Sequence, residues 1–168
     1  MSLFQDFSLF EAKDLFSLAN AACGVAGAAL ALGGNALAFS YVFGCIALDW
    51  ADGRLARAGG RSGTALGKEL DSLADCISFA CVPALFCFLA APSAAALAGG
   101  TAFVLAGVVR LALFNVQQEK NVFWGLPSPA AAVALVAASV LAPAWAWLAS
   151  LALAFLMVAG FKFRKPAL

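Results

Sequence analysis

The sequence contains no histidine, and residues that carry a formal charge make up only 11% of its 168 positions. The missing imidazole excludes Ser–His and Cys–His catalysis, because both need that side chain as the general base. It also leaves the carboxylates as the natural metal ligands of this chain. A net charge of +1 gives no indication of a nucleic acid partner.

The scarcity of charge is matched by an excess of apolar residues, which make up 64% of the chain at a mean hydropathy of +0.96. A soluble domain is about half apolar and a quarter charged. The core of a water-soluble protein of this length could not bury such an excess of apolar residues. The composition therefore predicts an integral membrane protein. The five cysteines show no CxxC spacing and lie in or beside apolar runs, so we expect them to act as small hydrophobes.

Residues 1–14 differ from the rest of the chain in being rich in polar side chains. They carry three acidic residues against a single lysine, whereas a cleavable signal peptide begins with a basic stretch. Phe4, Phe7 and Phe10 recur near helical spacing between the polar residues. This spacing predicts a short amphipathic juxtamembrane helix in the membrane interface, with a frayed N-terminal tail as the alternative.

Three long stretches, 15–48, 76–109 and 121–161, contain no Asp, Glu, Lys or Arg. One membrane-spanning helix takes about 20 apolar residues, so each stretch has room for two. Near the middle of each stretch, Gly or Pro in LGGNA, APSAA or APAWA predicts a turn. We therefore expect an all-α protein in which a domain over residues 15–165 forms three hairpins and hence six transmembrane helices. The expected spans are 15–33, 35–58, 68–91, 94–115, 127–142 and 145–163.

The lysines and arginines all lie at the N-terminus, between the second and third helices, between the fourth and fifth, or after the sixth. The expected hairpin tips carry none. With six spans, all four charged regions fall on one side, which the positive-inside rule makes cytoplasmic. We therefore expect a protein of the cell (inner) membrane whose termini and acidic residues lie on the cytoplasmic side.

Four aspartates stand at the expected cytoplasmic ends of the second and third helices. Asp49 and Asp52 are three residues apart and Asp71 and Asp75 are four apart, so each pair shares one face of its helix. Antiparallel helices can direct both pairs at one another, and the four carboxylates would then repel unless cations lay between them. Ligands that are all oxygen suit Mg²⁺, Mn²⁺ or Ca²⁺. Two such ions could clamp the attacking and leaving oxygens of a phosphoryl displacement.

Small residues accompany the aspartates. Gly53, Ala56 and Gly67 leave room for a flat or bulky ligand against the backbone, and Arg57 offers its charge to a phosphate. A solvated loop is one alternative, although it does not require helical spacing of the carboxylates. A divalent-cation transporter is another, but it would hold its carboxylates near the midplane of the membrane. A structural membrane subunit would have no use for four clustered aspartates.

The segment from Asp49 to Asp75 has the order D-x-x-D-G-x-x-A-R, then G-x-x-x-D-x-x-x-D. This pattern resembles the signature of the CDP-alcohol phosphotransferase family, although the interval between Arg57 and Gly67 is one residue longer than is common there. The resemblance implies a reaction in which a CDP-linked lipid donates its phosphatidyl-type group to an alcohol and CMP leaves. It further implies a homodimer and a six-helix fold.

The resemblance also implies roles for the residues of the motif. The four aspartates would hold two divalent cations, and Asp75 would remove the proton of the acceptor hydroxyl. Gly53, Ala56 and Gly67 would make room for the cytidine, and Arg57 would support the motif or the phosphates. Asn20, an amide within the first expected helix, is a further candidate for nucleotide binding, with a helix–helix hydrogen bond as the alternative.

Two further stretches, ELDSLADCISF from Glu69 and RLALFN…FWGLPSPAAA from Arg110, resemble the phosphatidylserine synthase branch of that family. This resemblance implies L-serine as the acceptor, although Leu113 stands where the branch often has a second arginine. The Arg110 guanidinium suits the carboxylate of serine or a phosphate, and a positive-inside anchor is its alternative role. Arg61 and Lys68 are the next candidates for acceptor binding. Glycerol 3-phosphate and inositol phosphate remain alternative acceptors, and the lipid is either diacylglycerol or archaeol.

Overall fold

The computed structural model describes residues 10–11, 14–58, 64–116, 122–160 and 162–164, and these are predominantly helical. The elements in chain order are α1 (Asp14–Leu32), a 3₁₀ helix (Ala36–Ser40), α2 (Tyr41–Ala58), α3 (Ala65–Asp75), a π-helical segment (Cys76–Cys81), α4 (Val82–Ala90), α5 (Ala94–Val116), β1 (Val122–Trp124), α6 (Ser128–Leu141), a second 3₁₀ helix (Pro143–Trp145), α7 (Ala146–Val158) and β2 (Lys162–Arg164).

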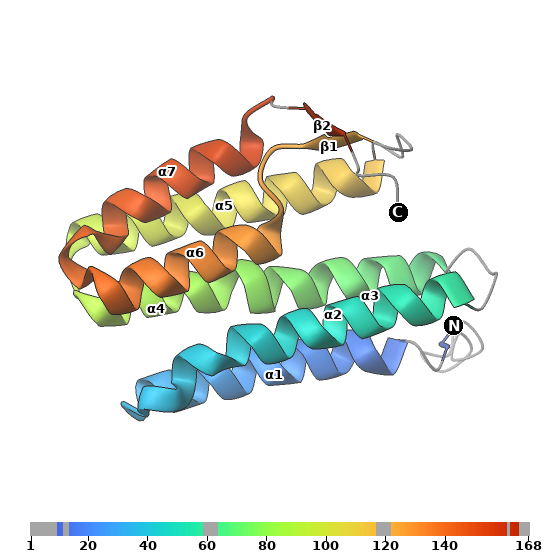
Figure 1. Cartoon of the computed structure of the whole chain (residues 1–168), viewed down its shortest axis with the longest axis horizontal. Coiled ribbons are helices and arrows are strands. Elements are labelled where there is room, and N and C mark those ends of the chain that lie inside the picture. The colour runs from blue at the N-terminus through green and yellow to red at the C-terminus, as the bar shows by residue number, and fades with distance from the viewer. Residues whose placement is uncertain (1–9, 12–13, 59–63, 117–121, 161, 165–168) are drawn as a thin grey trace, which may run out of the picture.

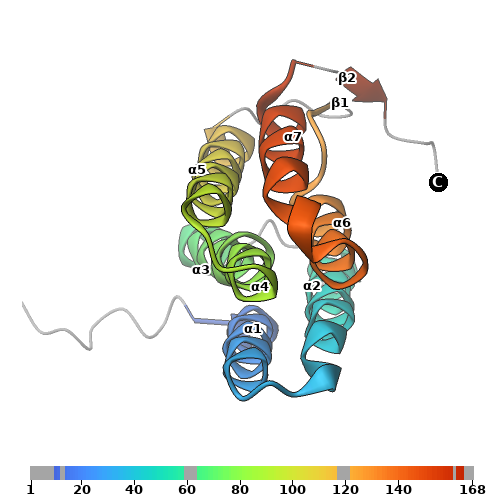
Figure 2. The ribbon, with the colours of Figure 1, turned by 90° about the vertical axis from the view of Figure 1, so that its left-hand side faces the viewer.

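The helices form hairpins that lie side by side along the long axis of the molecule (Figure 1). The connections from α1 to α2, from α4 to α5 and from α6 to α7 all lie at one end. The other end carries the start of α1, the end of α2, the start of α3, the end of α5 and both strands. A view from the side shows α1 and α2 at one edge of the bundle and α5 and α7 at the opposite edge (Figure 2). This is the hairpin arrangement that the three charge-free stretches predict.

The outer surface of the bundle is apolar. Large side chains such as Leu141 and Val116 are 82% and 80% exposed, which suits a surface covered by lipid and not by water. Among the described residues, three helices are long and apolar enough to cross a membrane, and three further apolar helices are shorter. The expected amphipathic segment 1–14 lies mostly outside the described residues. The three long helices are Asp14–Leu32, Ala65–Ala90 and Ala94–Val116, and the shorter ones are Leu37–Ala51, Ser128–Leu141 and Pro143–Val158.

Local hydrogen bonds set the ends of the first and third helices. After α1, Gly34 has a φ of +69°, and the N–H of Asn35 donates to the carbonyl of Leu30 at 3.0 Å. This is the glycine-terminated turn that the LGGNA stretch predicts. Helix α3 begins three residues before its predicted start, because Thr64 Oγ1 accepts a hydrogen bond of 3.0 Å from the N–H of Gly67 and caps the helix.

The π-helical segment joins α3 to α4 into one continuous helix. Pro83 lies just beyond it, and in an α-helix its ring would collide with the carbonyl of Phe79. The wider π turn, in which the N–H of Val82 bonds the carbonyl of Ile77, accommodates this proline. The hydrogen-bond pairing of the helix therefore changes directly after Asp75.

The predicted all-helical architecture is observed in the described residues, with one addition, a pair of three-residue strands. β1 pairs antiparallel with β2, with Phe123 opposite Phe163. Helix α7 accordingly ends at Val158, and the predicted span 145–163 is too long because Lys162 is already part of a strand. The pairing holds the residues before α6 beside the end of α7, where the N–H of Leu126 bonds a carbonyl of α7 at 3.0 Å.

Two clusters of buried side chains hold the bundle together. One includes Phe103 and Leu135 and joins α4, α5, α6 and α7. The other includes Phe79 and Tyr41 and joins α2, the π-helical segment, α4 and α6. Helix α1 approaches this second cluster closely, because a Cβ at Gly27 would overlap the ring of Tyr41. The close approach of α1 brings its polar residues against α3.

Candidate active site

Three carboxylates from α2 and α3 lie together. One oxygen from each of Asp49, Asp71 and Asp75 lies within 4.8 Å of the others, and all three side chains are half-buried. Asp71 and Asp75 are one turn apart on α3, and Asp49 comes from the neighbouring helix. Asp52 follows Asp49 by one turn of α2, and its side chain lies outside the described part of the chain. The predicted convergence of the two helix faces is thus observed for three of the four aspartates.

The cluster fits a divalent cation by its chemistry. Two carboxylates 4.8 Å apart repel by about 3.5 kcal/mol at an effective dielectric constant of about 20, and three of them form three such pairs. A cation between them would replace the repulsion by attraction. Half-buried ligands that are all oxygen suit Mg²⁺, Mn²⁺ and Ca²⁺ better than softer metals. Asp49, Asp71 and Asp75 could therefore hold a metal ion together.

Asn20 reaches this cluster from α1. Its side chain is 1% exposed, and its Nδ2 donates to Asp75 Oδ1 at 3.1 Å. Because a carboxylate only accepts, the contact turns the amide nitrogen toward Asp75 and the amide oxygen away from it. That oxygen, Asn20 Oδ1, is buried and has no hydrogen-bond partner among the described residues. The helix–helix hydrogen bond that the sequence left as an alternative for Asn20 is therefore present, and its nucleotide role stays a prediction.

The backbone around Asn20 is held by buried neighbours. Ser78 Oγ, in the π-helical segment, donates to the carbonyl of Asn20 at 2.9 Å. The hydroxyl of Tyr41 in turn donates to the carbonyl of Ser78 at 3.3 Å. A Cβ at Gly24 would come within 2.7 Å of Ser78 Oγ, so the glycine permits this close packing. The amide of Asn20 is therefore presented to Asp75 by a packed framework.

Arg110 approaches the cluster from α5. Its guanidinium interacts electrostatically with Asp75, and its Nη1 donates to Ser128 Oγ at 2.9 Å. Ser128 is the first residue of α6 and is 1% exposed. Arg110 Nε is buried and lacks a hydrogen-bond partner within the described ranges. The sequence predicts Arg110 as a cation near the site, whereas the contribution of Ser128 was missed, although GLPSP marked the start of its helix.

Lys68 makes a structural contact. Its Nζ donates to the carbonyl of Asn115 at 2.6 Å, in the last turn of α5. The side chain of Asn115 donates to Ser72 Oγ at 2.8 Å, and Ser72 Oγ donates to the carbonyl of Lys68 at 3.1 Å. A lysine that satisfies a carbonyl at a helix C-terminus stabilises that end. Lys68 therefore ties α3 to α5, and its predicted contact with an acceptor remains untested.

Of the other predicted residues, only some have side chains within the described part of the structure. Gly53 is half-buried on α2, and Gly67 is buried in the first turn of α3. Ala56 and Arg57 lie in the last turns of α2, and their side chains are outside the description. Arg61 lies outside the described residues. The two glycines thus stand on the helices that carry the aspartates, as the motif requires.

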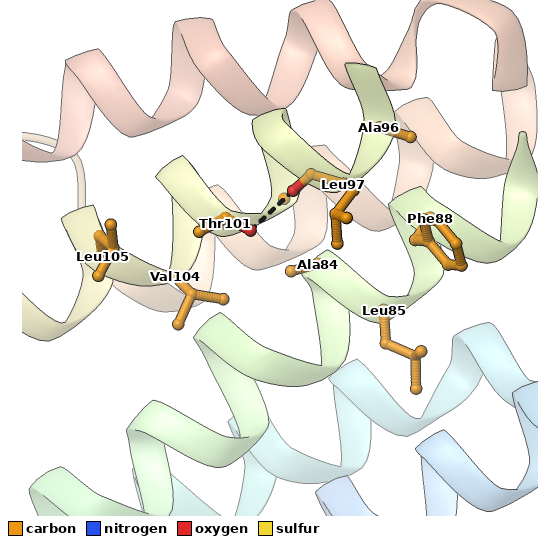
Figure 3. Close-up of a pocket in the computed structure, with 9 residues that line it drawn as sticks. Ala84, Leu85, Phe88, Ala96, Leu97, Thr101, Val104 and Leu105 are labelled. Atoms are coloured by element: carbon orange, nitrogen blue, oxygen red, sulfur yellow. Dashed lines mark hydrogen bonds between the residues drawn. The ribbon is translucent and has the colours of Figure 1, made fainter. Parts of the chain in front are cut away.

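A groove of about 310 Å³ lies between α4 and α5 and, unlike the aspartate cluster, is apolar (Figure 3). Ala84 and Phe88 of α4 and Leu97 and Val104 of α5 are among its lining residues, none of which is charged. The hydroxyl of Thr101 is bonded to the carbonyl of Leu97 at 2.8 Å. The groove therefore has no group for proton transfer or metal binding, and the chemistry belongs to the aspartate cluster.

Comparison with protein families gives a match over nearly the whole chain. Residues 12–161 match the family model described as CDP-alcohol phosphatidyltransferase. The matched range contains the aspartate cluster together with Asn20, Arg110 and Ser128.

Curated proteins of similar sequence carry related names. A CDP-diacylglycerol–serine O-phosphatidyltransferase of Methanocaldococcus jannaschii is 40% identical over 100 residues, which cover 58% of this chain and 48% of that protein. An archaetidylserine synthase of Methanothermobacter thermautotrophicus is 37% identical over 135 residues, with 76% and 57% covered. A CDP-diacylglycerol–serine O-phosphatidyltransferase of Bacillus subtilis is 31% identical over 128 residues, with 73% and 72% covered. The chain spans about half the length of the first two relatives.

Proposed function

The chain belongs to the CDP-alcohol phosphatidyltransferase family, and from this premise we propose that it transfers a phosphatidyl-type group from a CDP-linked lipid to the hydroxyl of L-serine. The products would be a phosphatidylserine-type lipid and CMP. The observation that carries the proposal is the meeting of Asp49, Asp71 and Asp75 within 4.8 Å of one another. The names of the relatives, which are serine O-phosphatidyltransferases and an archaetidylserine synthase, support serine as the acceptor.

The aspartates, with Asp52 as the fourth, would hold two divalent cations, Mg²⁺ or Mn²⁺, with Ca²⁺ as a third candidate. Bound there, the cations would offset the charge of the carboxylates and of the phosphoryl oxygens. The donor set supports this assignment, because half-buried carboxylates at 4.8 Å repel without a counter-charge. Asp52 is included among the proposed ligands because it lies one turn after Asp49 on the same helix.

Asp75 would act as the base. The serine hydroxyl oxygen attacks the phosphorus that bears the lipid, and the hydroxyl proton passes to the Asp75 carboxylate. The bond from that phosphorus to the bridging oxygen of the diphosphate breaks, and CMP leaves with the electron pair. The hydrogen bond from Asn20 to Asp75 Oδ1 holds one oxygen of the carboxylate and leaves the other for the proton.

The nucleotide would lie against the small residues of the motif. Gly53, Ala56 and Gly67 would leave room for the cytidine, and Arg57 would bind the diphosphate. Gly67 lies in the first turn of α3 and, as a glycine, has no side chain there. Arg61 remains a candidate for acceptor binding at this end of the bundle.

The protein would cross the cell membrane six times, with both termini and the aspartates on the cytoplasmic side, and would form a homodimer. The end of the bundle opposite the hairpin connections carries the end of α2, the start of α3, the end of α5 and β2 (Figure 1). The basic residues Arg54, Lys68, Arg110 and Lys162 belong to these elements, which supports this orientation. The lipid would be diacylglycerol or archaeol, since relatives carry names of both kinds.

The test is the identity of the product. The purified protein is given CDP-diacylglycerol, Mn²⁺, and serine, glycerol 3-phosphate and inositol phosphate at equal concentrations. We expect CMP release and a lipid product with the mass of phosphatidylserine. A glycerophosphate product would reject serine and leave the reaction class standing. No CMP release with any acceptor, from either CDP-diacylglycerol or CDP-archaeol, would reject the reaction class as well.

A further inference from the structure

Two buried polar atoms near Asp75 lack hydrogen-bond partners among the described residues: Asn20 Oδ1, an acceptor, and Arg110 Nε, a donor. Buried polar groups are nearly always paired, and leaving one unpaired destabilises the folded protein. Both side chains act on Asp75, Asn20 by its hydrogen bond of 3.1 Å and Arg110 by its charge. The proposed base is therefore flanked by one acceptor and one cationic donor that have a free hydrogen-bonding capacity.

The two atoms belong to helices on different sides of α3. Asn20 belongs to α1 and Arg110 to α5, and these helices lie on opposite sides of α3 in both views of the bundle (Figures 1 and 2). A small molecule with its hydroxyl at Asp75 would therefore lie between an acceptor on the side of α1 and a cation on the side of α5. That molecule would need a donor at one end and an anionic acceptor at the other.

We propose that Asn20 and Arg110 form the two halves of the acceptor subsite and select a zwitterion. Asn20 Oδ1 accepts a hydrogen bond from the ammonium group of L-serine, and the Arg110 guanidinium binds its carboxylate. The inference rests on the proposed function and reassigns Asn20 from the nucleotide to the acceptor. It makes Asn20 and Arg110 specificity-determining residues beside the base Asp75.

The orientation of both side chains supports this assignment. Asp75 only accepts hydrogen bonds, so it fixes Asn20 Nδ2 and leaves Oδ1 as the one polar atom of that amide still to be satisfied. Ser128 occupies Nη1 of Arg110 at 2.9 Å, which leaves the edge with Nε for a ligand. A carboxylate matches a guanidinium edge with two parallel hydrogen bonds. Ser128 is therefore a positioning residue for Arg110.

The experiment uses acceptors that each lack one group of serine. Ethanolamine has the hydroxyl and the ammonium group, and 3-hydroxypropionate has the hydroxyl and the carboxylate. The value of kcat/KM is measured for all three acceptors with saturating CDP-lipid and Mn²⁺. We expect the protein to favour serine over each analogue by about 10- to 100-fold, the value of one hydrogen bond to a charged group. An analogue used as well as serine would overturn the subsite without any variant.

Variants assign each contact to its residue. In Arg110→Gln the preference for serine over ethanolamine should fall about tenfold or more, with the preference over 3-hydroxypropionate kept. In Asn20→Ala the preference for serine over 3-hydroxypropionate should fall, with the preference over ethanolamine kept. Asn20→Ala also removes the hydrogen bond to Asp75, and this loss lowers kcat for all acceptors alike. The ratio of kcat/KM between two acceptors is therefore unaffected by it. Ser139→Ala, which removes a buried hydroxyl bonded within α6, should leave every ratio unchanged.

The outcomes separate the two proposals. If serine is used but each variant lowers kcat/KM for the three acceptors by one common factor, the subsite is wrong and the proposed function stands. If serine is not used by the unaltered protein, the proposed function fails first. Should a variant not fold, Arg110→Lys and Asn20→Gln carry the same comparison, and the analogues on the unaltered protein decide alone.

Discussion

Asp75→Asn is the change that separates the charge of the proposed base from its shape. The new amide is of the same size, and its oxygen can still accept the hydrogen bond from Asn20 Nδ2, now 3.1 Å long. What disappears is one negative charge and one proton acceptor. The stability of the variant should therefore rise in chelator, whereas its turnover, measured with Mn²⁺, should fall.

The magnitude follows from the pairwise terms. The carboxylate of Asp75 is repelled by Asp49 and Asp71 and attracted by Arg110. At 4.8 Å, the upper limit of the distances between the three carboxylate oxygens, each carboxylate pair repels by about 3.5 kcal/mol at an effective dielectric constant of about 20. Taking the attraction of Arg110 as equal in size to one of these repulsions leaves a net repulsion of about one pair. Since 1 kcal/mol corresponds to about 2–4 °C in a chain of this size, the variant should melt about 7–14 °C higher in chelator.

A divalent cation should remove most of this difference in stability. Binding at a concentration of 100 times Kd stabilises a folded protein by about 2.7 kcal/mol, and the unaltered cluster should gain this from Mn²⁺. The variant has lost one carboxylate and should gain much less. Its transfer rate should fall about 10²- to 10⁴-fold, the usual contribution of a general base, which corresponds to about 2.7–5.4 kcal/mol.

The assay is thermal unfolding in detergent, with chelator and with excess Mn²⁺, alongside CMP release. Glu69→Gln is the matched control, because it removes an exposed carboxylate from the same helix and should alter neither measurement. A variant that melts below the unaltered protein in chelator, while the control is unchanged, would refute the repulsion. Near-normal turnover would show that the acceptor proton is removed in another way.

Three further predictions concern the metal, the orientation and the packing. Chelator should abolish CMP release and Mn²⁺ or Mg²⁺ should restore it; turnover that continues in chelator would reject the metal site. In a cysteine-free background, a single cysteine at position 35 should react with a reagent outside the cell and one at position 63 should not, and the opposite pattern would invert the proposed topology. Gly27→Ala should lower the free energy of unfolding by about 1–3 kcal/mol, because its Cβ meets the ring of Tyr41. Gly33→Ala, whose nearest neighbours would be 3.5 Å away, should change it little.

The helices were predictable because charge is so expensive inside a membrane that its absence marks them. The charge-free stretches and their central turns place the ends of α1, α5 and α6 within one or two residues. The meeting of Asp49 with Asp71 and Asp75 was predictable as well, since helical spacing alone assigns each pair to a face. Local rules are sufficient for features of this kind.

The remaining features depend on partners distant in sequence. The hydrogen bond from Asn20 joins residues 55 positions apart, and only the packing of α1 on α3 brings them together. β1 and β2 have three residues each, too few for an alternating pattern to be recognised. The π turn did have a local signal in Pro83, but a proline near the middle of a long helix indicates a kink as readily as a π turn.

The π-helical segment has a consequence for how this helix could change in evolution. Each residue of an α-helix turns the chain by about 100°, so the loss or gain of one residue would rotate everything on one side of it. One half of the Ala65–Ala90 helix directs carboxylates at α2, and the other half directs Cys87 into the core. Deleting one residue from Cys76–Cys81 would restore α-helical pairing. It would also rotate one half of the helix relative to the other, so that the carboxylates and Cys87 could not both keep their directions. We therefore expect insertions and deletions to be accepted in the loops at either end of this helix and rejected within it, so that the distance in sequence from Asp75 to Cys87 stays constant among related enzymes even where their loops differ.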